Sequence, residues 1–309
     1  MKRHSLPPQA RLATTAALAA LLLAGCGDDE PTSSSGDDPA STPAAETSDA
    51  TEPTDPGSTD SAEPTESDTA PASTIEVPVF FVADTPAGQG LVAEVRAVGD
   101  DNPLEEAAAL VTAGDVLDPD YRTLFPSGSF ASVTFDGEQF VVTLADDSWN
   151  TRPAGMSAAD AELAVQQLVY TLQAVQGEEA PVAVQPSGRL LGIEAASVDA
   201  ADELEVRSFV NVLSPAEGAT VSDTFTASGE ASSFEATVPW QVRDSSGAKV
   251  LEGFATAEGW IDGLYPWETE VDVSSLAPGE YTFVALTDDP SGGAEGNGPS
   301  EDTKTIVVE

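Results

Sequence analysis

The side chains best suited to nucleophilic or metal-binding chemistry are almost absent from this chain. Its only histidine is His4 and its only cysteine is Cys26, so residues 27–309 contain neither type. That segment therefore cannot build a Ser-His-Asp triad, a Cys-His dyad, a zinc site of the usual ligands or a c-type haem attachment. What remains is carboxylate chemistry, because 54 acidic residues stand against 11 basic ones. The sequence predicts no cofactor.

The excess of carboxylates limits the partners that the protein can bind. The formal net charge is −43, which argues against nucleic acid because its phosphates would be repelled. Carboxylate-dependent hydrolysis of cell-wall glycans needs two carboxyl groups about 5–10 Å apart across a cleft. The sequence specifies no such pair, and a solvated acidic surface is the favoured interpretation. Hard cations and protein surfaces remain as partners.

Cys26 ends a segment that has the features of an export signal. Three basic residues precede an apolar run over residues 12–23, which is too short for a membrane span of about 20 residues. The run ends in Leu23-Ala24-Gly25-Cys26, which resembles the bacterial lipobox, in which the cysteine thiol receives a diacylglyceryl group. We therefore expect residues 1–25 to be a lipoprotein signal peptide and lipid on Cys26, such as palmitate, to anchor the protein. A secretory signal beside an incidental cysteine is the alternative.

Residues 26–74 have the composition of a tether. From residue 27 to residue 74 there are 13 acidic side chains, no Lys or Arg, and no Val, Ile, Leu, Met or aromatic residue. Such a segment buries too little apolar surface to offset the entropy cost of ordering it, so we expect it to be disordered. It would serve as an acidic Ser/Thr/Pro-rich spacer that holds the folded region away from the membrane. O-glycosylation of its hydroxyl groups stays open.

Residues 75–195 have the pattern of an α+β domain. Alternating or continuous apolar runs predict strands over residues 75–82, 91–98, 130–135, 139–144 and 182–184. Pro103 opens one predicted helix, which Gly114 ends. Ser157 and Asp160 open a second helix over residues 158–175 as an approximate capping box. The order β-β-α-β-β-α-β predicts a sheet with two helices on one face.

This first region resembles the GerMN domain of sporulation and spore-germination proteins. The resemblance is carried by Val79-Phe80-Phe81-Val82, by Val95-Arg96-Ala97-Val98, by the helix around Ala107-Ala108-Ala109-Leu110-Val111 and by Gln167-Leu168-Val169-Tyr170-Thr171-Leu172. It implies a role of the kind played in sporulation or germination, and a capacity for self-association. Where the family often has Gly-Pro after its first helix, this chain has Ala113-Gly114-Asp115.

A linker over residues 196–207 is expected to lead to a second domain over residues 208–309. About seven short strands with frequent turn signals predict an all-β sandwich. The stretch resembles the immunoglobulin-like domain of bacterial spore-germination proteins, which often follows GerMN. The passage from Gly229 to Phe234-Glu235, the Pro278-Gly279 turn before Tyr281 and the glycine-rich last loop carry this resemblance.

Two groups of residues in the second region are candidate binding sites. Four carboxylates flank or lie in the glycine-rich last loop and would suit Ca²⁺, namely Asp288, Asp289, Glu295 and Asp302. No EF-hand spacing is present, so a solvated loop with acidic edges is the favoured interpretation, with no metal bound. Trp260 and Tyr265 would stack on a sugar or a partner if exposed, but covering the edge of the sandwich core is the favoured role.

We expect a non-enzymatic lipoprotein that lies outside the cytoplasm on the membrane of a bacterium. It would present two interaction modules to peptidoglycan or to another envelope protein, with the membrane contacted through Cys26. A carboxylate-dependent wall hydrolase and a ligand-binding lipoprotein are the alternatives. Binding proteins for transporters usually have two α/β lobes, which an immunoglobulin-like second half does not supply.

Overall fold

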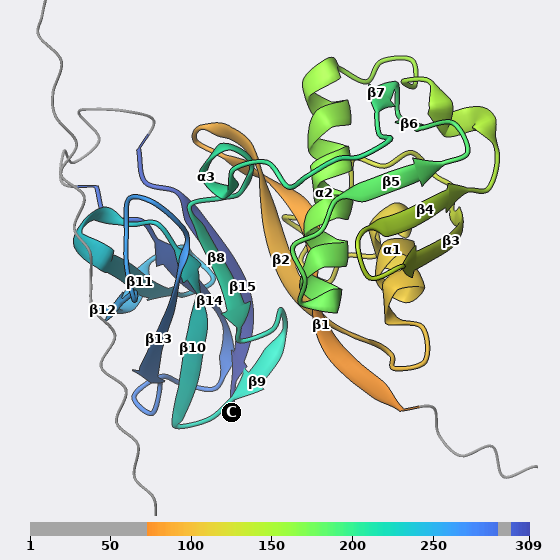
Figure 1. The fold of residues 1–309 in the computed structure, drawn as a ribbon. Helices are drawn as coiled ribbons and strands as arrows, with labels where there is room; N and C mark the ends of the chain where they lie inside the picture. The colour runs from red at the N-terminus through yellow and green to blue at the C-terminus, as the bar shows by residue number, and fades with distance from the viewer. Residues whose placement is uncertain (1–72, 290–297) are drawn as a thin grey trace, which may run out of the picture. The chain divides into compact units, whose positions relative to one another are not determined.

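The computed structural model describes residues 73–289 and 298–309 (Figure 1). The expected signal peptide, Cys26 and the expected tether lie outside these residues, and so does Glu295. Among the described residues, no helix is long and apolar enough to cross a membrane.

The first two strands form a long antiparallel hairpin of β1 (Thr74–Thr85) and β2 (Gly88–Gly99). The run from Val79 to Val82 is continuously apolar because both of its faces are covered. Val79 and Phe81 enter the main core of the first region, while Phe80 and Val82 enter a smaller cluster on the opposite face.

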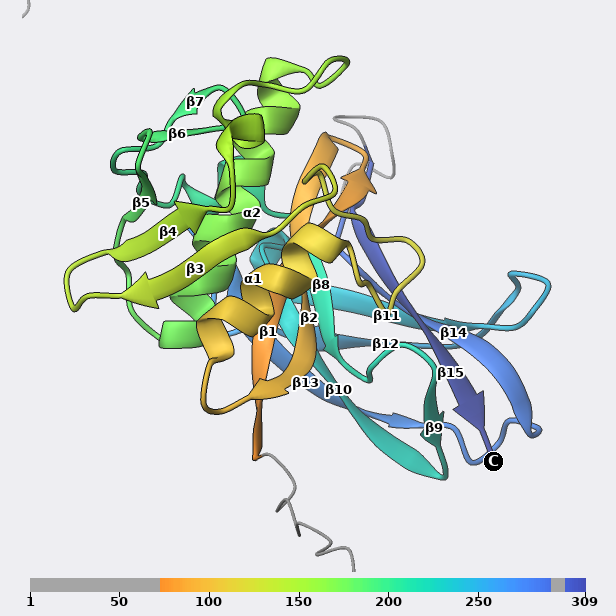
Figure 2. The same cartoon turned by 90° about the vertical axis from the view of Figure 1, so that its right-hand side faces the viewer.

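Two helices pack on this hairpin and begin and end where the sequence predicts. Helix α1 (Pro103–Ala113) has proline in its first turn and ends at Gly114 in the left-handed conformation. Helix α2 (Ala158–Gln176) begins with a complete capping box between Ser157 and Asp160. Helix α1 contacts the hairpin, β3 and α2, and α2 also contacts β1 (Figure 2).

The remaining strands of the first region form sheets of their own. Strands β3 (Phe130–Phe135), β4 (Phe140–Leu144) and β5 (Val182–Gln185) form a three-stranded sheet in the order β3-β4-β5. The fold class is confirmed as α+β, but the strands divide between the hairpin and this small sheet. The elements that the sequence pattern did not predict are short: η1 (Asp147–Asn150), β6 (Arg189–Leu190), β7 (Ile193–Glu194) and α3 (Glu203–Val206).

The second region is a β-sandwich, as predicted. Its strands are β8 (Val210–Ser214), β9 (Ala219–Val221), β10 (Thr224–Ala231), β11 (Thr237–Arg243), β12 (Lys249–Thr256), β13 (Tyr265–Asp272), β14 (Gly279–Leu286) and β15 (Glu301–Val308), with η2 (Phe234–Ala236) between β10 and β11. One sheet has the order β13-β10-β8 and the other β12-β11-β14-β15-β9. Apolar residues from both sheets fill the space between them, including Val238, Trp267, Phe283 and Ile306.

Candidate functional site

Side chains from outside the hairpin complete both of its free edges. On the β1 side, Thr171 accepts a hydrogen bond from the Phe80 amide at 3.0 Å, and Gln167 donates to the Phe80 carbonyl at 3.0 Å. On the β2 side, Asn211 of β8 accepts from the Ala93 amide at 2.8 Å and donates to its carbonyl at 3.2 Å. Because buried backbone groups without partners are costly, these three side chains hold α2 and the sandwich against the hairpin.

A buried cluster of charged and polar residues joins the first region to the sandwich. Lys304 of β15 is 3% exposed and donates from Nζ to Asp118 at 2.5 Å and to the Tyr121 hydroxyl at 2.7 Å. Tyr121 in turn donates to Asp302 at 2.7 Å. The Val212 amide and Asn211 supply two further donors to Asp302, at 2.6 Å and 3.1 Å. We call these five side chains, Asp118, Tyr121, Asn211, Asp302 and Lys304, the interdomain cluster.

A second buried pair shapes the loop that carries Asp118. Glu94 of β2 is 6% exposed and accepts from the amides of Leu117 and Asp118, the latter at 2.8 Å. Arg96 binds Glu94 and also the carboxylate of Asp115 at 3.1 Å. Glu94 and Arg96 therefore position the loop after α1, and with it Asp118, opposite Lys304.

Burial changes the titration of two members of the interdomain cluster. It raises the pKa of Asp118 above its ordinary value, although the nearby Lys304 ammonium opposes this. It also raises the pKa of Tyr121 well above its usual range, and the negative charge of Asp302 adds to that effect. A neutral Tyr121 is therefore a stable hydrogen-bond donor to Asp302 at all physiological pH values.

The space beside the interdomain cluster is too small for a substrate. Glu94, Glu217 and Lys304 line a hollow of about 20 Å³, which is room for a single water molecule. The carboxylates of Glu94, Asp118 and Asp302 all accept hydrogen bonds from within the chain, so they stabilise the contact between the two regions.

Of the four carboxylates that are candidate calcium ligands, the structure describes Asp288, Asp289 and Asp302. Asp302 is 6% exposed and belongs to the interdomain cluster, so its oxygens accept from Tyr121, Asn211 and backbone amides. The amide of Asp288 donates to Ser233 at 2.6 Å. Glu295 lies outside the described residues. Within the described residues no group of three acidic, histidine or cysteine side chains is placed to hold a metal ion.

The aromatic candidates lie along one end of the sandwich. Trp260 is half-buried and packs edge-on against Phe234, with ring centroids 5.2 Å apart. Tyr265 is also half-buried and donates to Asp262 at 2.7 Å. Trp267, 3% exposed, belongs to the sandwich core.

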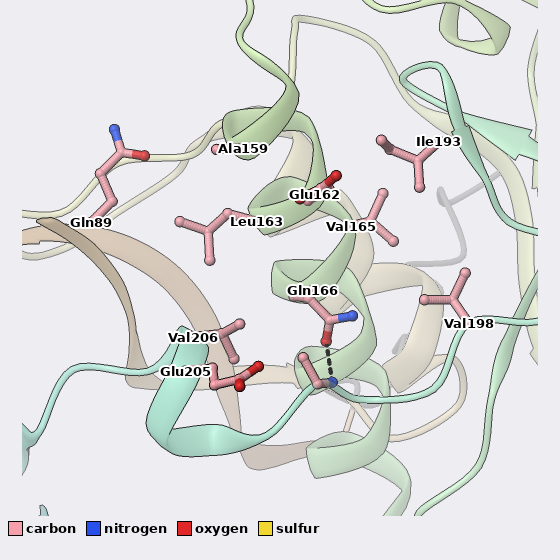
Figure 3. Close-up of a pocket in the computed structure, with 11 residues that line it drawn as sticks. Gln89, Ala159, Glu162, Leu163, Val165, Gln166, Ile193, Val198, Glu205 and Val206 are labelled. Carbon is pink, nitrogen blue, oxygen red and sulfur yellow. Dashed lines mark hydrogen bonds between the residues drawn. The ribbon is translucent and has the colours of Figure 1, made fainter. Parts of the chain in front are cut away.

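Three hollows that the sequence pattern does not predict lie beside α2. The first, about 520 Å³, lies between α2 and the segment that leads through α3, and Figure 3 shows Leu163 and Gln166 facing Val206 and Glu205 there. Gln166 fixes that segment by accepting from the Ala201 amide at 2.8 Å and donating to the Asp199 carbonyl at 3.1 Å. Two further hollows, of about 420 and 390 Å³, lie beside Tyr170, whose hydroxyl donates to the Ala201 carbonyl at 2.6 Å. Burial raises the pKa of Tyr170 to about 12, so its phenol stays neutral.

Comparison with known protein families assigns both regions. Residues 78–190 match the family model described as sporulation and spore germination. Residues 209–294 match the model described as the immunoglobulin-like domain of bacterial spore germination. The chain carries a GerMN domain followed by a germination-type immunoglobulin-like domain. No curated protein matches the sequence significantly.

Similar solved structures share little sequence with this chain. The tandem GerMN domains of the sporulation protein GerM from Bacillus subtilis are 15% identical over 65% of this chain, with a TM-score of 0.32. A lytic polysaccharide monooxygenase from Jonesia denitrificans is 15% identical over 31%, with a TM-score of 0.21. An endo-β-1,4-mannanase from Thermotoga petrophila is 13% identical over 52%, with a TM-score of 0.26. This chain spans 62%, 60% and 37% of those structures, respectively, and we infer no activity from likenesses of this size.

The interdomain cluster draws on the GerMN domain, the immunoglobulin-like domain and the strand that follows its matched range. Asp118 and Tyr121 belong to the GerMN match and Asn211 to the immunoglobulin-like match, whereas Asp302 and Lys304 lie beyond residue 294. All of these residues belong to one compact unit. The two domains of this protein are therefore joined by buried side chains as well as by the chain between them.

The Asn211 amide offers a direct test of this contact. We expect Asn211→Ala to lower the free energy of unfolding by about 2–3 kcal/mol, because it leaves the Ala93 amide and carbonyl buried without partners. Urea unfolding followed by tryptophan fluorescence measures the change. Gln176→Ala removes an exposed amide at the end of α2 and serves as the control. Equal stability of the two variants would mean that Asn211 does not hold the edge of β2.

Proposed function

We propose that this protein is a non-enzymatic lipoprotein of a bacterial cell envelope, in which the GerMN and immunoglobulin-like domains act as one interaction unit. The observation that carries the proposal is the interdomain cluster. It commits the buried carboxylates Asp118 and Asp302 to holding two domains together and leaves no substrate-sized space beside them. Two domains joined in this way would present their binding surfaces at a fixed distance from each other, which suits an interaction protein better than an enzyme.

The proposed role also rests on the domain types and on the N-terminal sequence. Both domains are of the sporulation and germination type. Leu23-Ala24-Gly25-Cys26 has the order that bacterial lipidation requires, and 47 residues of tether composition separate Cys26 from the first strand. Lipid on Cys26 would hold the protein at the outer face of the cytoplasmic membrane, because each buried methylene contributes about 0.8 kcal/mol. The tether would then let the domains reach the wall.

We expect Cys26→Ala to abolish lipidation and to move the protein from the membrane fraction to the soluble fraction. No other cysteine is available for acylation, so the loss should be nearly complete. Incorporation of radiolabelled palmitate in cells that express the full chain, followed by fractionation, measures both effects. Ser34→Ala in the same N-terminal segment is the matched control. Label or membrane association that persisted in Cys26→Ala would rule out the proposed anchor.

Co-sedimentation of the full chain with purified peptidoglycan sacculi tests the partner and the absence of catalysis together. Binding without release of soluble muropeptides would support a wall-directed interaction module. Release of fragments, lost on substitution of a single Asp or Glu, would instead establish a wall hydrolase and overturn the non-enzymatic role. If neither occurs, peptidoglycan is not the partner, and crosslinking of the lipidated protein in cells would identify the envelope protein that is.

A further inference from the structure

Two loops that cross between the sheets meet at one end of the sandwich. Residues 232–236 connect β10 to β11, and residues 257–264 connect β12 to β13. The Ala257 amide donates to the Ala236 carbonyl at 2.9 Å, so the second loop binds the first. The hydroxyl of Ser233, a residue that is 3% exposed, adds hydrogen bonds to β11 and to the segment that leaves β14. We call residues 232–236 and 257–264 the tip loops.

The second tip loop is built around the ring of Tyr265. A Cβ atom at Gly259 would lie 2.6 Å from this ring, and one at Gly263 would lie 3.6 Å from it, so both glycines pack directly against the ring. The Tyr265 hydroxyl also donates to Asp262 at 2.7 Å. Tyr265 therefore holds the second tip loop in one conformation.

The tip loops present large apolar side chains to solvent. Ile261 is 69% exposed and Phe234 is 41% exposed. Trp260 is half-buried and packs edge-on against Phe234, with ring centroids 5.2 Å apart. We call Phe234, Trp260 and Ile261 the tip patch. Side chains this exposed contribute little to folding, and apolar groups gathered on a surface often mark a site of interaction.

The backbone beside the tip patch adopts conformations that are costly for these residues. Ile261 has a φ of 80°, and the consecutive residues Glu235 and Ala236 have φ values of 52° and 59°. The left-handed region is an outlier for a β-branched residue such as isoleucine, whereas glycine adopts it freely. Because the side chain of Ile261 is exposed, its burial does not offset this strain within the described structure. Strain of this kind is concentrated at functional sites.

The tip patch has an acidic rim. Three exposed carboxylates lie within two residues of it and form no ion pair with any described Lys or Arg: Glu235, Glu258 and Asp262. An apolar centre with a charged rim is the usual arrangement of a protein interface. The sign of this rim favours a partner that carries positive charge.

The protein itself has no segment that suits the tip patch. Residues 27–74 carry 13 carboxylates and no cation, so the acidic rim repels them. A second copy of the chain is also a poor occupant. Of the eight Lys and Arg residues between 73 and 309, all except Arg152 are already in ion pairs in the described structure. The occupant that fits must come from another protein and must bring its own positive charge.

We propose that the tip patch binds a basic segment of a partner protein. Apolar side chains of that segment would pack on Phe234, Trp260 and Ile261, and its Lys or Arg side chains would pair with the rim carboxylates. The inference rests on the proposed role as an interaction unit. The lipidation and sacculus tests of that role do not involve the tip loops, so either proposal can fail without the other.

The first test uses the full chain in detergent and a fluorescein-labelled peptide of about eight residues, alternating lysine and leucine. The variant Phe234→Ser, Ile261→Ser removes the two exposed apolar side chains of the patch. We expect it to weaken binding about tenfold, measured by fluorescence anisotropy. The control Ile75→Ser, Leu117→Ser removes two exposed apolar side chains of the GerMN domain, and we expect a change below about twofold. Equal weakening by the two variants, or no binding to the unaltered chain, would overturn the proposal.

The rim charges are tested in the same assay. We expect Glu235→Gln, Glu258→Gln to weaken binding about fivefold at about 0.15 M salt. The control Glu138→Gln, Glu280→Gln removes two exposed charges outside the tip loops and should change binding less than about twofold. Equal effects of the two pairs would reduce the binding to general attraction by an acidic protein and overturn the proposal.

Ile261→Gly separates binding from folding. Glycine adopts a φ of 80° without strain, so the melting temperature should be unchanged or higher, while peptide binding should weaken about threefold. A lower melting temperature would mean that Ile261 is needed for the fold, and unchanged binding would mean that its side chain does not touch the peptide. Either result would overturn the proposal.

Discussion

Lys304→Met should lower the free energy of unfolding by about 3–5 kcal/mol at pH 7. The substitution keeps the length of the side chain but removes the ammonium group that pairs with Asp118 and donates to Tyr121. Asp118, 1% exposed, is then left as a buried carboxylate without its cation. Urea unfolding followed by tryptophan fluorescence reports on both domains, because Trp149 lies in the GerMN domain and the other tryptophans lie in the sandwich.

This destabilisation should depend on pH in a defined direction. Burial holds the pKa of Asp118 above its ordinary value even with Lys304 present, and loss of the cation should raise that pKa further. A carboxyl group with a raised pKa in the folded state favours folding below its unfolded pKa, and that contribution is lost as the pH rises through the folded pKa. The stability difference between Lys304→Met and the unaltered chain should therefore be largest at pH 7 and should shrink towards pH 4.

Two further variants test whether the destabilisation comes from breaking the buried Lys304–Asp118 ion pair or simply from removing a positive charge. Lys249→Met removes a surface ion pair with Glu252 and should cost no more than about 1 kcal/mol. The double variant Lys304→Met, Asp118→Leu replaces the buried pair with apolar groups and should recover much of the lost stability, as buried pairs often allow. If Lys304→Met were as mild as Lys249→Met, the two domains would not depend on the interdomain cluster.

Gly229→Ala should lower the free energy of unfolding about as much as Lys304→Met, because the added methyl group has no space. A Cβ atom at this position would lie 1.9 Å from the Asn211 carbonyl oxygen and 2.9 Å from the Trp267 ring. The first contact is with the backbone of β8, so no rotation of a side chain relieves it. We expect a loss of about 3 kcal/mol or more, because overpacking that must move a strand exceeds the usual cost of added volume. Thermal unfolding monitored by circular dichroism measures it.

Gly229→Ala should also weaken the contact between the sandwich and the GerMN domain. Moving β8 away from β10 displaces Asn211, which bridges to Ala93 of the GerMN domain. Ser228→Ala, one residue earlier on the same strand, meets no such contact and should change stability by less than about 0.5 kcal/mol. A Gly229→Ala protein with the melting temperature of Ser228→Ala would contradict the close approach of β8 and β10.

Local sequence signals predicted the elements that carry long periodic patterns. Pro103 and Gly114 delimit α1, and Ser157 with Asp160 opens α2, because capping depends on residues within one turn. The pattern from Lys304 to Val308 likewise predicts the last strand, which the structure extends back to Glu301. The sequence pattern does not predict the two-residue strands β6 and β7 or the single turn of α3, because segments this short have no periodicity.

The burial pattern of two strands shows which sequence feature corresponds to the interdomain cluster. Along β15, Asp302 and Lys304 share the inward face with the core residues Ile306 and Val308. Along β2, it is the face carrying Glu94 that is buried, while Val95 is 37% exposed. A charged residue at an inward position of a strand signals a buried partner, but the pattern cannot say which segment supplies that partner. From the sequence alone, Asp302 is therefore one of four carboxylates around the last loop, with no buried partner predicted for it.

The sequence by itself determined the domain types, the helix limits, the strand alternation and the shortage of imidazole and thiol chemistry, because each follows from neighbouring residues or from composition. Only the tertiary structure decided that Lys304 meets Asp118 across 186 residues, that Asn211 completes the edge of β2, and that residues 199–201 bind Gln166 and Tyr170 of α2. These contacts depend on which surfaces meet when two domains pack. Which surfaces meet is determined by the burial of apolar groups and by the pairing of polar groups that lie far apart in the chain.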